Sequence, residues 1–438
     1  MAKSKTKGVR FTKTRVIIFL VIAVILGVSM LFSAQIDNLY QQMVGNTNVA
    51  TSDEILANSK LSINYVNVGQ GDCIMVNLPD DKNMIIDAGQ TQGDDETTTE
   101  HVIEYAKANV IQDGQKFDYM VLTHAHLDHV SMLDNVLEEF DVGIVVRPPE
   151  FYQSDTDEEL TNKETELANK VGATIKSSYN TTKTATMRRF LNDAYNEPNC
   201  EMLVTNDEIV WEGQDDEGNT YTIKFYTIDM EKYYNPPSES AFTNENNYSP
   251  LIVLTYKGHS IAFTGDGEKE SEQALIEKYG SALPNVDFMD LAHHGSRTGN
   301  IAEFIEALDP EYAIVSVGKN NSYGLPDEEV YEILKNYDPE FANRIFSTAD
   351  YGDIVIGFNY IAPTTGEDLD DSTKTASTSN NTLVTNGDVA VGISSGEYSS
   401  QTVIKWWYIA LGLIVLSAIL IFLTPSKQKK LIKKLNKK

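Results

Sequence analysis

Three histidines and one aspartate occupy a six-residue segment that follows an apolar run, residues 119–123, and precedes a helix-like stretch, residues 130–140. Imidazole suits zinc, iron or manganese, and carboxylate favours harder ions. The 438-residue chain holds only seven histidines, so three in one turn favour a metal site over an ordinary polar surface turn. We therefore predict a strand-to-helix turn that serves two neighbouring ions, with these ligands: His124, His126, Asp128 and His129.

Two later strand-like runs also end in ligand-type side chains. Residues 260–264 are followed by Asp266, which can bridge two ions or, as the alternative, cap the next helix. Residues 286–291 are followed by His293 and His294. This pair predicts one metal ligand and one group that orients a ligand or contacts substrate. The residues alone leave open which histidine has which role.

The segment 61–361 has the pattern of one folded domain. Strand-like runs lie close together at its start, and strands alternate with helix-like stretches after them, which favours sheets covered by helices. Residues 35–60 are polar and weakly patterned, and we predict a stalk there. Residues 362–403 are rich in Ser, Thr, Asn, Asp and Gly, so we predict a flexible tether that buries too little apolar surface to fold.

Two apolar segments, residues 16–34 and 404–424, are long enough to span a bilayer. Basic tails flank them, residues 1–15 and 425–438, and positive charge marks the cytoplasmic side of a membrane. We therefore predict two transmembrane helices in a lipid bilayer, with both termini cytoplasmic and the domain between them extracellular. A cleaved signal peptide is the alternative for the first segment, although its apolar run is longer than a usual signal core.

The predicted extracellular segment is strongly acidic. Counting Lys405 at its border, it holds all 64 acidic residues but only 22 of the 35 basic ones, which gives it a net charge of −42. Nucleic-acid binding without sequence preference requires a basic surface that displaces counterions, so this composition argues against that function. A nucleolytic site remains compatible with it, because bound cations can supply positive charge locally.

Seven short motifs occur in order within residues 61–360. With them the chain resembles metallo-β-lactamase-fold hydrolases, and within these the extracytoplasmic hydrolase domain of ComEC-type competence DNA-uptake proteins. The motifs are residues 67–72 (Asn-Val-Gly-Gln-Gly-Asp), 85–89 (Ile-Ile-Asp-Ala-Gly), 124–129, 247–251 (Asn-Tyr-Ser-Pro-Leu), 263–266 (Phe-Thr-Gly-Asp), 293–296 (His-His-Gly-Ser), and 316–318 with 321–324.

The resemblance implies a fold and a metal content. The fold is an α/β, four-layer αββα sandwich, here flanked by one transmembrane helix at each end. Its site would hold two divalent ions, zinc or manganese. The implied ligands are His124 and His126 on one ion, Asp128 and His129 on the other, Asp266 as a bridge between them, and His293 on the second ion.

The resemblance also suggests roles beside the ligands. Our working assignment gives catalysis to Asp128, Asp266 and His294, while the choice between His293 and His294 as the ligand stays open. Asp87 is expected to orient the ligands from behind. Asp128 can also accept the proton of the attacking water.

One superfamily ligand has no counterpart in this sequence, because no histidine lies between His129 and His259. We therefore expect Asn247 or Ser249 to lie near the first ion. Loop residues after later strands are candidates for contacting a phosphate, with ordinary solvated loop side chains as the alternative. These candidates are His294, Ser296, Lys319, Asn321 and Tyr323.

Together these features predict a membrane-anchored, extracytoplasmic, metal-dependent hydrolase of a bacterium with a Gram-positive type of envelope. A water activated by two metal ions suits a phosphodiesterase or nuclease. The first alternative is an esterase for envelope phosphoesters of the teichoic-acid or phosphocholine type, because cell-surface phosphocholine esterases share much of the motif order. The second alternative is a non-catalytic binding module on the same fold.

Overall fold

The structure is a computed structural model that describes residues 52–91, 95–112, 114–151, 153–154, 157–173, 175, 182–229, 244–361, 382–386 and 389–393. All of them belong to one compact unit, Asn48–Gly396. Both predicted transmembrane segments and both basic tails lie outside the described residues. Among the helices that are described, none is long and apolar enough to cross a membrane.

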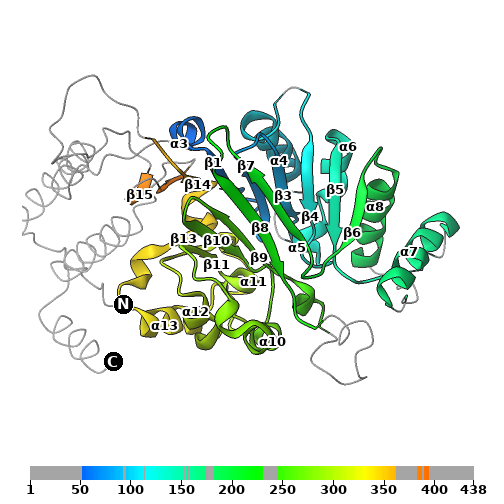
Figure 1. Ribbon diagram of the computed structural model, residues 1–438. Coiled ribbons are helices and arrows are strands. Elements are labelled where there is room, and N and C mark those ends of the chain that lie inside the picture. Colours follow the sequence, from blue (N-terminus) through cyan, green and yellow to red (C-terminus); the bar gives the residue numbers. More distant parts are fainter. Residues whose placement is uncertain are drawn as a thin grey trace, which may run out of the picture. The chain divides into compact units, whose positions relative to one another are not determined.

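Two β-sheets form the centre of this unit (Figure 1). The first has the strand order β15-β16-β14-β1-β2-β3-β4-β5-β6, and the second has the order β13-β12-β11-β10-β9-β8-β7. The first sheet comprises β1 (Leu61–Tyr65), β2 (Cys73–Asn77), β3 (Asn83–Ala88), β4 (Phe117–Val121), β5 (Val142–Arg147), β6 (Glu201–Val204), β14 (Ile354–Phe358), β15 (Thr382–Asn386) and β16 (Val389–Ile393). The second comprises β7 (Val210–Gln214), β8 (Thr220–Tyr226), β9 (Leu251–Tyr256), β10 (His259–Phe263), β11 (Phe288–Asp290), β12 (Tyr312–Val315) and β13 (Ile345–Ser347).

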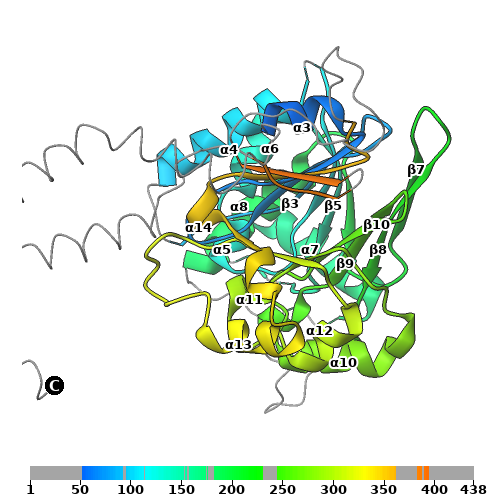
Figure 2. The same cartoon turned by 90° about the vertical axis from the view of Figure 1, so that its left-hand side faces the viewer.

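Helices cover the outer face of each sheet, with the strands between them (Figure 2). Helices of the first half are α3 (Ser52–Asn58), α4 (Asp95–Asn109), α5 (Leu127–Val130), α6 (Leu133–Glu139), α7 (Glu158–Val171) and α8 (Thr182–Asn196). Those of the second half are α10 (Lys269–Tyr279), α11 (Ala292–Gly295), α12 (Ala302–Leu308), α13 (Glu328–Tyr337) and α14 (Thr348–Tyr351), with the 3-10 turns η2 (Glu245–Tyr248), η3 (Gly280–Ala282) and η4 (Phe341–Arg344).

The apolar cores follow from the alternation of side chains along each strand. On β2, Ile74 and Val76 enter the core between the two sheets, whereas Cys73 and Met75 enter the core beneath the helices of the first half. A third core joins the second sheet to α10, α12 and α13. Because both faces of the central strands are buried, strands such as β3, β11 and β12 are buried along their whole length. The predicted αββα layering is confirmed.

The predicted tether at 362–403 is wrong for residues 382–386 and 389–393. These segments form the strands β15 and β16, which pair antiparallel with each other, and β16 also pairs antiparallel with β14 along its whole length. Val389, Val391 and Ile393 point into the core between the sheets, while Ala390 packs with Ile55 of α3. The polar composition of the surrounding segment masks this short apolar alternation. The rest of the predicted tether from residue 362 lies outside the described residues.

The start of the domain also lies earlier than predicted. Within the predicted stalk, residues 35–60, helix α3 belongs to the folded unit because Ile55 is fully buried against Val355, Tyr360 and Ala390. The backbone N–H of Ile361 also donates to the carbonyl of Asn58 at 2.9 Å. Residues 35–51 lie outside the described part of the chain.

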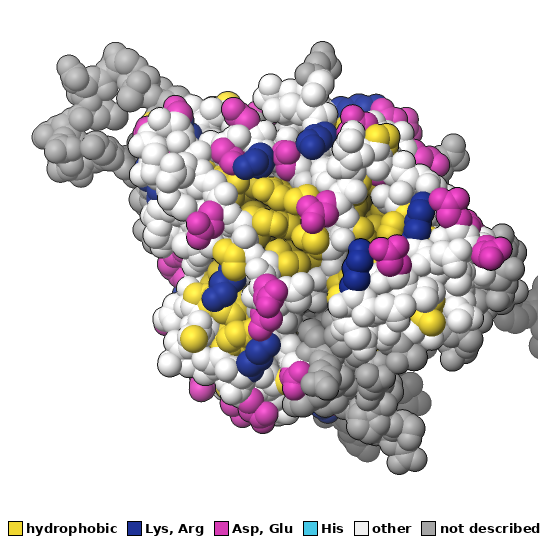
Figure 3. Space-filling view, turned by 45° about the vertical axis from the view of Figure 1, so that its right-hand side comes forward, with side chains coloured by type: hydrophobic (Ala, Val, Ile, Leu, Met, Phe, Trp, Pro, Cys, Tyr) yellow, Lys and Arg dark blue, Asp and Glu magenta, His cyan; other side chains and the backbone are white. Residues whose placement is uncertain are grey.

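One edge of the sandwich is open where β6 and β7 are the last strands of their sheets. Partly buried Ile144, Leu203 and Trp211 pack against the inner core there, and the Trp211 ring stacks on Tyr119 with their centroids 4.0 Å apart. Figure 3 shows apolar side chains on this side of the molecule, bordered by acidic and basic side chains. This apolar surface therefore continues the packing between the sheets.

Candidate metal centre

Parallel strands bring the predicted site residues together. Strands β3 to β6 run parallel in the first sheet, and β10 to β13 run parallel in the second. Asp87 lies at the end of β3, the histidine turn follows β4, Asp266 follows β10, and the histidine pair follows β11. Since the carboxyl ends of parallel strands share one edge of a sheet, all these side chains converge on one rim of the sandwich.

The turn after β4 is packed tightly against the turn after β3. The carbonyl of His126 accepts hydrogen bonds from the backbone N–H groups of His129 and Val130, which starts the short helix α5. A Cβ atom at Gly89 would lie 2.3 Å from the backbone nitrogen of His129, so only glycine permits this approach. The backbone N–H of Asp72 donates to the carbonyl of Asp128 at 2.9 Å. The histidine turn is therefore fixed by the glycine-containing motifs that precede it.

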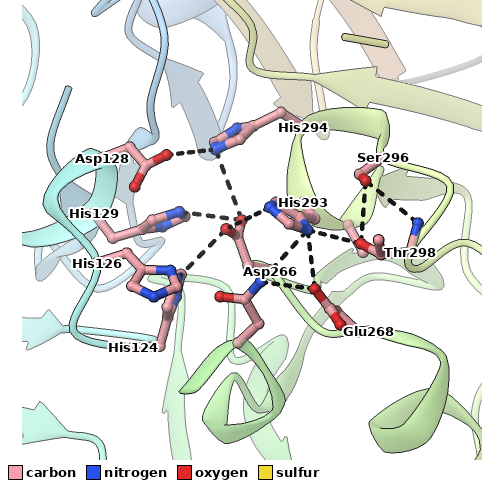
Figure 4. A network of polar contacts seen from close by, with 12 residues as sticks. His124, His126, Asp128, His129, Asp266, Glu268, His293, His294, Ser296 and Thr298 are labelled. Atoms are coloured by element: carbon pink, nitrogen blue, oxygen red, sulfur yellow. Dashed lines mark hydrogen bonds and ion pairs between the residues drawn. The ribbon is translucent and has the colours of Figure 1, made fainter. Parts of the chain in front are cut away.

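Asp266 lies at the centre of the site, and its two carboxylate oxygens face different histidines (Figure 4). Oδ1 lies 3.1 Å from His129 Nε2 and 3.7 Å from His294 Nε2. Oδ2 lies 3.5 Å from His124 Nε2 and 3.6 Å from His293 Nε2. The Asp266 side chain is 1% exposed, so its charge is shielded from solvent. One carboxylate thus joins two groups of imidazoles, as expected of a bridging ligand.

The structure separates the adjacent histidines after β11. Both have left-handed backbone conformations, with φ of 53° at His293 and 54° at His294. His294 Nδ1 donates to the carbonyl of Ser316 at 2.9 Å, and its Nε2 lies 3.4 Å from Asp128 Oδ2. His293 Nδ1 instead lies 2.9 Å from Thr298 Oγ1. The two rings therefore approach Asp266 from different directions.

This separation distinguishes the two histidines, whose roles the residues alone left open. His294 is the histidine that joins Asp128, His129 and Asp266 in a four-residue group whose ligand-type atoms lie within 4.8 Å of one another. A second group of this kind contains His124, His126 and Asp266. His293 belongs to neither group, although its Nε2 faces Asp266 Oδ2 beside that of His124. The difference arises because consecutive left-handed residues point their side chains apart.

Hydrogen-bond partners behind the rings fix which nitrogen faces inward. Asp87 Oδ2 accepts from His129 Nδ1 at 2.8 Å and from the Thr123 hydroxyl at 2.7 Å. Because that hydroxyl donates to Asp87, it accepts from His124 Nδ1 at 3.2 Å. Asp87 therefore orients His129 directly and His124 through Thr123. Such partners raise the basicity of metal-binding imidazoles, and Asp87 takes the supporting position expected of it.

Among the acidic residues near the rings, Asp72 and Glu245 were not singled out from the sequence. Asp72 Oδ2 lies 3.7 Å from His129 Nδ1, and Asp72 Oδ1 lies 3.4 Å from His294 Nδ1. Glu245 Oε2 lies 3.4 Å from His126 Nε2. The Gly-Gln-Gly-Asp motif was a signal for Asp72, but no sequence feature distinguishes Glu245 from other acidic residues. Both carboxylates add negative charge around the imidazoles.

The donor set fits divalent metal ions. Three buried atoms that point into the four-residue group have no hydrogen-bond partner among the described residues: His129 Nε2, His294 Nε2 and Asp266 Oδ1. A buried polar atom without a partner is costly, and a shared cation would satisfy all three atoms. Mixed imidazole and carboxylate donors suit zinc, manganese or iron. The ligand roles themselves stay predictions.

The charges of the site perturb its pKa values strongly. Burial would raise the pKa of Asp266, but the imidazoles of His129, His294 and His124 outweigh it and hold that pKa well below its usual value. Burial would lower the pKa of His129, but Asp266 and Asp87 raise it well above its usual value. For Asp128, burial would raise the pKa, but the nearby imidazoles of His294 and His129 outweigh it, so this pKa is lowered. Asp128 and Asp266 are therefore ionised at neutral pH.

Ser249 and Asn247, the two residues predicted to lie near the first ion, take different positions in the structure. Ser249 Oγ lies 3.4 Å from His124 Nδ1 and accepts the backbone N–H of Asp266 at 3.2 Å. Asn247 Oδ1 accepts the backbone N–H groups of Glu268 and Ser271, both at 3.3 Å. Ser249 therefore lies beside the site, whereas this Asn247 oxygen caps the start of α10.

The predicted phosphate contacts also differ from one another. Asn321 uses both ends of its amide to hold its own loop, because it donates to the carbonyls of Gly318 and Leu325 and accepts two backbone N–H groups. Ser296 is buried, and its hydroxyl lies 3.1 Å from Thr298 Oγ1. Lys319 is exposed. Only Tyr323 in this set is both exposed and part of the wall of the pocket described next.

An open pocket of about 320 Å³ lies over the rings. Its wall combines ligand-type side chains from both sheets with side chains from neighbouring loops. They are Gln70, Thr91, His126, Leu127, Asp128, His293, His294, Tyr323 and Leu325.

Comparison with known proteins agrees with this geometry. Residues 66–183 match the metallo-β-lactamase superfamily. The matched segment includes the histidine turn and ends before Asp266. This match supports a metal-dependent hydrolase, and the matched fold implies divalent metal binding.

Curated relatives confirm the resemblance to competence proteins. The chain is 25% identical to ComE operon protein 3 of Bacillus subtilis over 290 residues, which cover 64% of this chain and 31% of the relative. It is 36% identical to competence protein ComA of Neisseria gonorrhoeae over 94 residues, which cover 22% and 14% of the two chains. The similarity thus spans about a third or less of these relatives.

Solved structures give weaker likenesses. A CmlA β-hydroxylase variant matches with a TM-score of 0.37 and 11% identity, covering 68% of this chain and 54% of that one. Zn²⁺-bound PqqB from Methylobacterium extorquens matches with a TM-score of 0.33 and 11% identity, covering 64% and 85%. Scores at this level carry no argument about activity.

Proposed function

We propose that this protein is a metal-dependent phosphodiesterase. The observation that carries the proposal is that Asp266 joins two groups of ligand-type side chains, each group facing a different carboxylate oxygen. A pair of donor groups around one shared carboxylate suits two close cations, and two-metal sites are typical of phosphoester hydrolysis. The names of the relatives, competence protein among them, support a nucleic-acid phosphodiester as one substrate class.

In this proposal, different residues bind metal, accept a proton and orient the imidazole rings. His124 and His126 would hold the first cation, and Asp128, His129 and His294 would hold the second, with Asp266 contributing to both groups. Bound divalent cations lower the pKa of a water and neutralise charge on a phosphoryl group. Asp128 lies at the pocket wall as an ionised carboxylate, so it can accept a proton from a water there. Asp87 keeps the rings of His129 and His124 in their productive orientation.

We also propose that the domain is anchored in a cell membrane and lies outside the cell. The apolar segments 16–34 and 404–424, each flanked by a basic tail, support this arrangement. Protease treatment of intact cells checks it. Cleavage within residues 61–361 from outside is expected, and protection of these residues in intact cells would contradict the proposal.

The second candidate substrate is an envelope phosphodiester such as a teichoic-acid or phosphocholine ester. The acidity of the segment that follows residue 34 favours it over long nucleic acid, because its net charge of −42, counted through Lys405, repels polyanions at low salt. Both candidates require the same phosphodiester chemistry, so one assay series separates them.

The test uses the full-length chain in detergent, loaded with Mn²⁺ or Zn²⁺. We expect hydrolysis of bis-p-nitrophenyl phosphate, and loss of turnover in Asp266→Ala and His124→Ala. The matched control is His259→Ala, because His259 lies on the strand that leads to Asp266 but belongs to neither ligand group. Full metal loading without turnover of this ester, of single-stranded DNA or of a choline-phosphate ester would instead identify a non-catalytic binding module.

A further inference from the structure

The wall of the pocket over the metal centre carries no lysine or arginine among the described residues. Its ionisable side chains are the ligand-type residues themselves, and the rest of the wall is neutral. Exposed Lys319 and Arg297, which pairs with Asp327 at 3.6 Å, lie nearby in sequence but are not among the wall residues. The pocket can therefore bind one phosphate through bound metal, while additional phosphates find no cationic partner in this wall.

A rigid loop supplies the apolar part of the wall. Asn321 Nδ2 donates to the carbonyls of Gly318 at 3.0 Å and Leu325 at 2.7 Å. Its Oδ1 accepts the backbone N–H groups of Tyr323 at 3.1 Å and Leu325 at 3.0 Å. These four hydrogen bonds fix the loop before any ligand arrives, so binding to it costs little ordering entropy.

This loop presents an aromatic ring to solvent beside the ligand-type side chains. Tyr323 is 59% exposed and lies in the pocket wall with Leu325 and Leu127. Among the described residues it is one of three exposed large hydrophobic side chains, and the other two, Val210 and Ile361, are not in this wall. A rigid exposed aromatic side chain suits stacking against a flat ligand group.

We propose that the substrate is a phosphodiester with a single charged group and a flat aromatic or apolar arm, which stacks on Tyr323. This inference rests on the proposed phosphodiesterase function and specifies its substrate class. The phosphate lies over the metal centre, and the arm lies across Tyr323 and Leu325. A nucleoside-sized arm fits this description, whereas a long polyanion does not.

The charge of the protein predicts the sign of the salt effect. A protein that binds nucleic acid through basic residues loses affinity as salt rises, because it no longer gains from counterion release. An acidic domain with a neutral pocket wall repels a polyanion, and salt screens this repulsion. Affinity for an oligonucleotide is therefore expected to rise with salt, while affinity for a singly charged ester stays nearly constant.

Calorimetry on the metal-loaded full-length chain tests the inference without requiring turnover. The probes are methyl(phenyl)phosphinate, dimethylphosphinate and a short oligothymidylate, and the two phosphinates carry the single charge of a phosphodiester without an ester bond to hydrolyse. We expect methyl(phenyl)phosphinate to bind about tenfold more tightly than dimethylphosphinate, as one aromatic stack predicts. This preference should vanish in Tyr323→Ala and persist in Tyr323→Phe, which keeps the ring. Thr91→Lys, at an exposed wall position, should tighten oligothymidylate binding.

Equal affinities for methyl(phenyl)phosphinate and dimethylphosphinate would overturn the inference. The same holds for an oligothymidylate that binds more tightly than methyl(phenyl)phosphinate and weakens as salt rises. Failure of the proposed function would give a different result. The binding affinities could still be measured, but no phosphodiester would be hydrolysed.

Discussion

The two turns that deliver histidines to the site reach the same rim by different backbone routes. The turn after β4 starts the short helix α5, and its ligand-type residues are spread over positions 124–129. The turn after β11 has only the adjacent pair His293 and His294, both with left-handed backbone conformations. Each turn sends one imidazole towards each oxygen of Asp266. This comparison shows that the side chains of adjacent residues can face different oxygens of Asp266 when both residues have left-handed backbone conformations.

Replacing His293 and His294 one at a time should give the largest expected difference in turnover between two variants. His294→Ala removes a member of the four-residue group and should lower turnover by more than about 100-fold, beyond the range typical of supporting residues. His293→Ala should cost only about tenfold, because His293 lies outside both close groups. Metal analysis of the two variants checks the difference. Equal loss of metal from both would show that the turn does not separate its histidines.

Removing the support behind the first turn should have the next largest effect. Asp87→Asn weakens the hydrogen bonds that orient His129 directly and His124 through Thr123. Metal affinity should fall by about 10- to 100-fold, and titration of the metal-free protein with Mn²⁺ measures it. Glu245→Gln should cost less, because Glu245 lies 3.4 Å from the partly exposed ring of His126. A larger loss in the Glu245 variant would reverse this ranking of supporting residues.

Two buried side chains, Asn300 and Glu272, support the second histidine turn. The burial of Glu272 predicts that the stability of the protein depends on pH. Asn300 bonds the backbone of Ala292 through both ends of its amide. Buried Glu272 accepts the backbone N–H groups of Asn300 and Ile301, and burial raises its pKa to about 8. The folded state thus prefers the protonated acid. Protonated Glu272 therefore contributes to the free energy of unfolding. This contribution is fully present below the unfolded-state pKa of 4.5 and is lost as the pH rises through the folded-state pKa of about 8.

Thermal unfolding between pH 5 and pH 9 checks this sign. The melting temperature of the wild type should fall relative to that of Glu272→Gln as the pH rises, because glutamine stays neutral throughout. The two curves should separate most above pH 8. Parallel curves of melting temperature against pH for the two proteins would contradict the prediction. They would mean that Glu272 is ionised in the folded protein across this range.

Much of the fold and of the site follows from local sequence patterns. The strand ending before the histidine turn, the aspartate after residues 260–264 and the histidine pair were all recognisable, because apolar runs that end in polar ligand-type residues identify strand ends. The paired strands β15 and β16 were missed because their apolar alternation is short and lies within a polar segment. Glu245 was missed because an acidic residue at the start of a 3-10 turn has no distinctive pattern.

The sequence by itself determined which residue types stand at the ends of the strands, and therefore that the rim would be rich in imidazole and carboxylate groups. Only the tertiary structure decided how they group: which oxygen of Asp266 each ring faces, that His294 rather than His293 joins Asp128, and that Asp72 and Glu245 lie beside the rings. The physical reason is that strand ends are encoded locally by alternation and turn residues. Distances between side chains from different strands depend on how two sheets pack and on backbone conformations that no local pattern specifies.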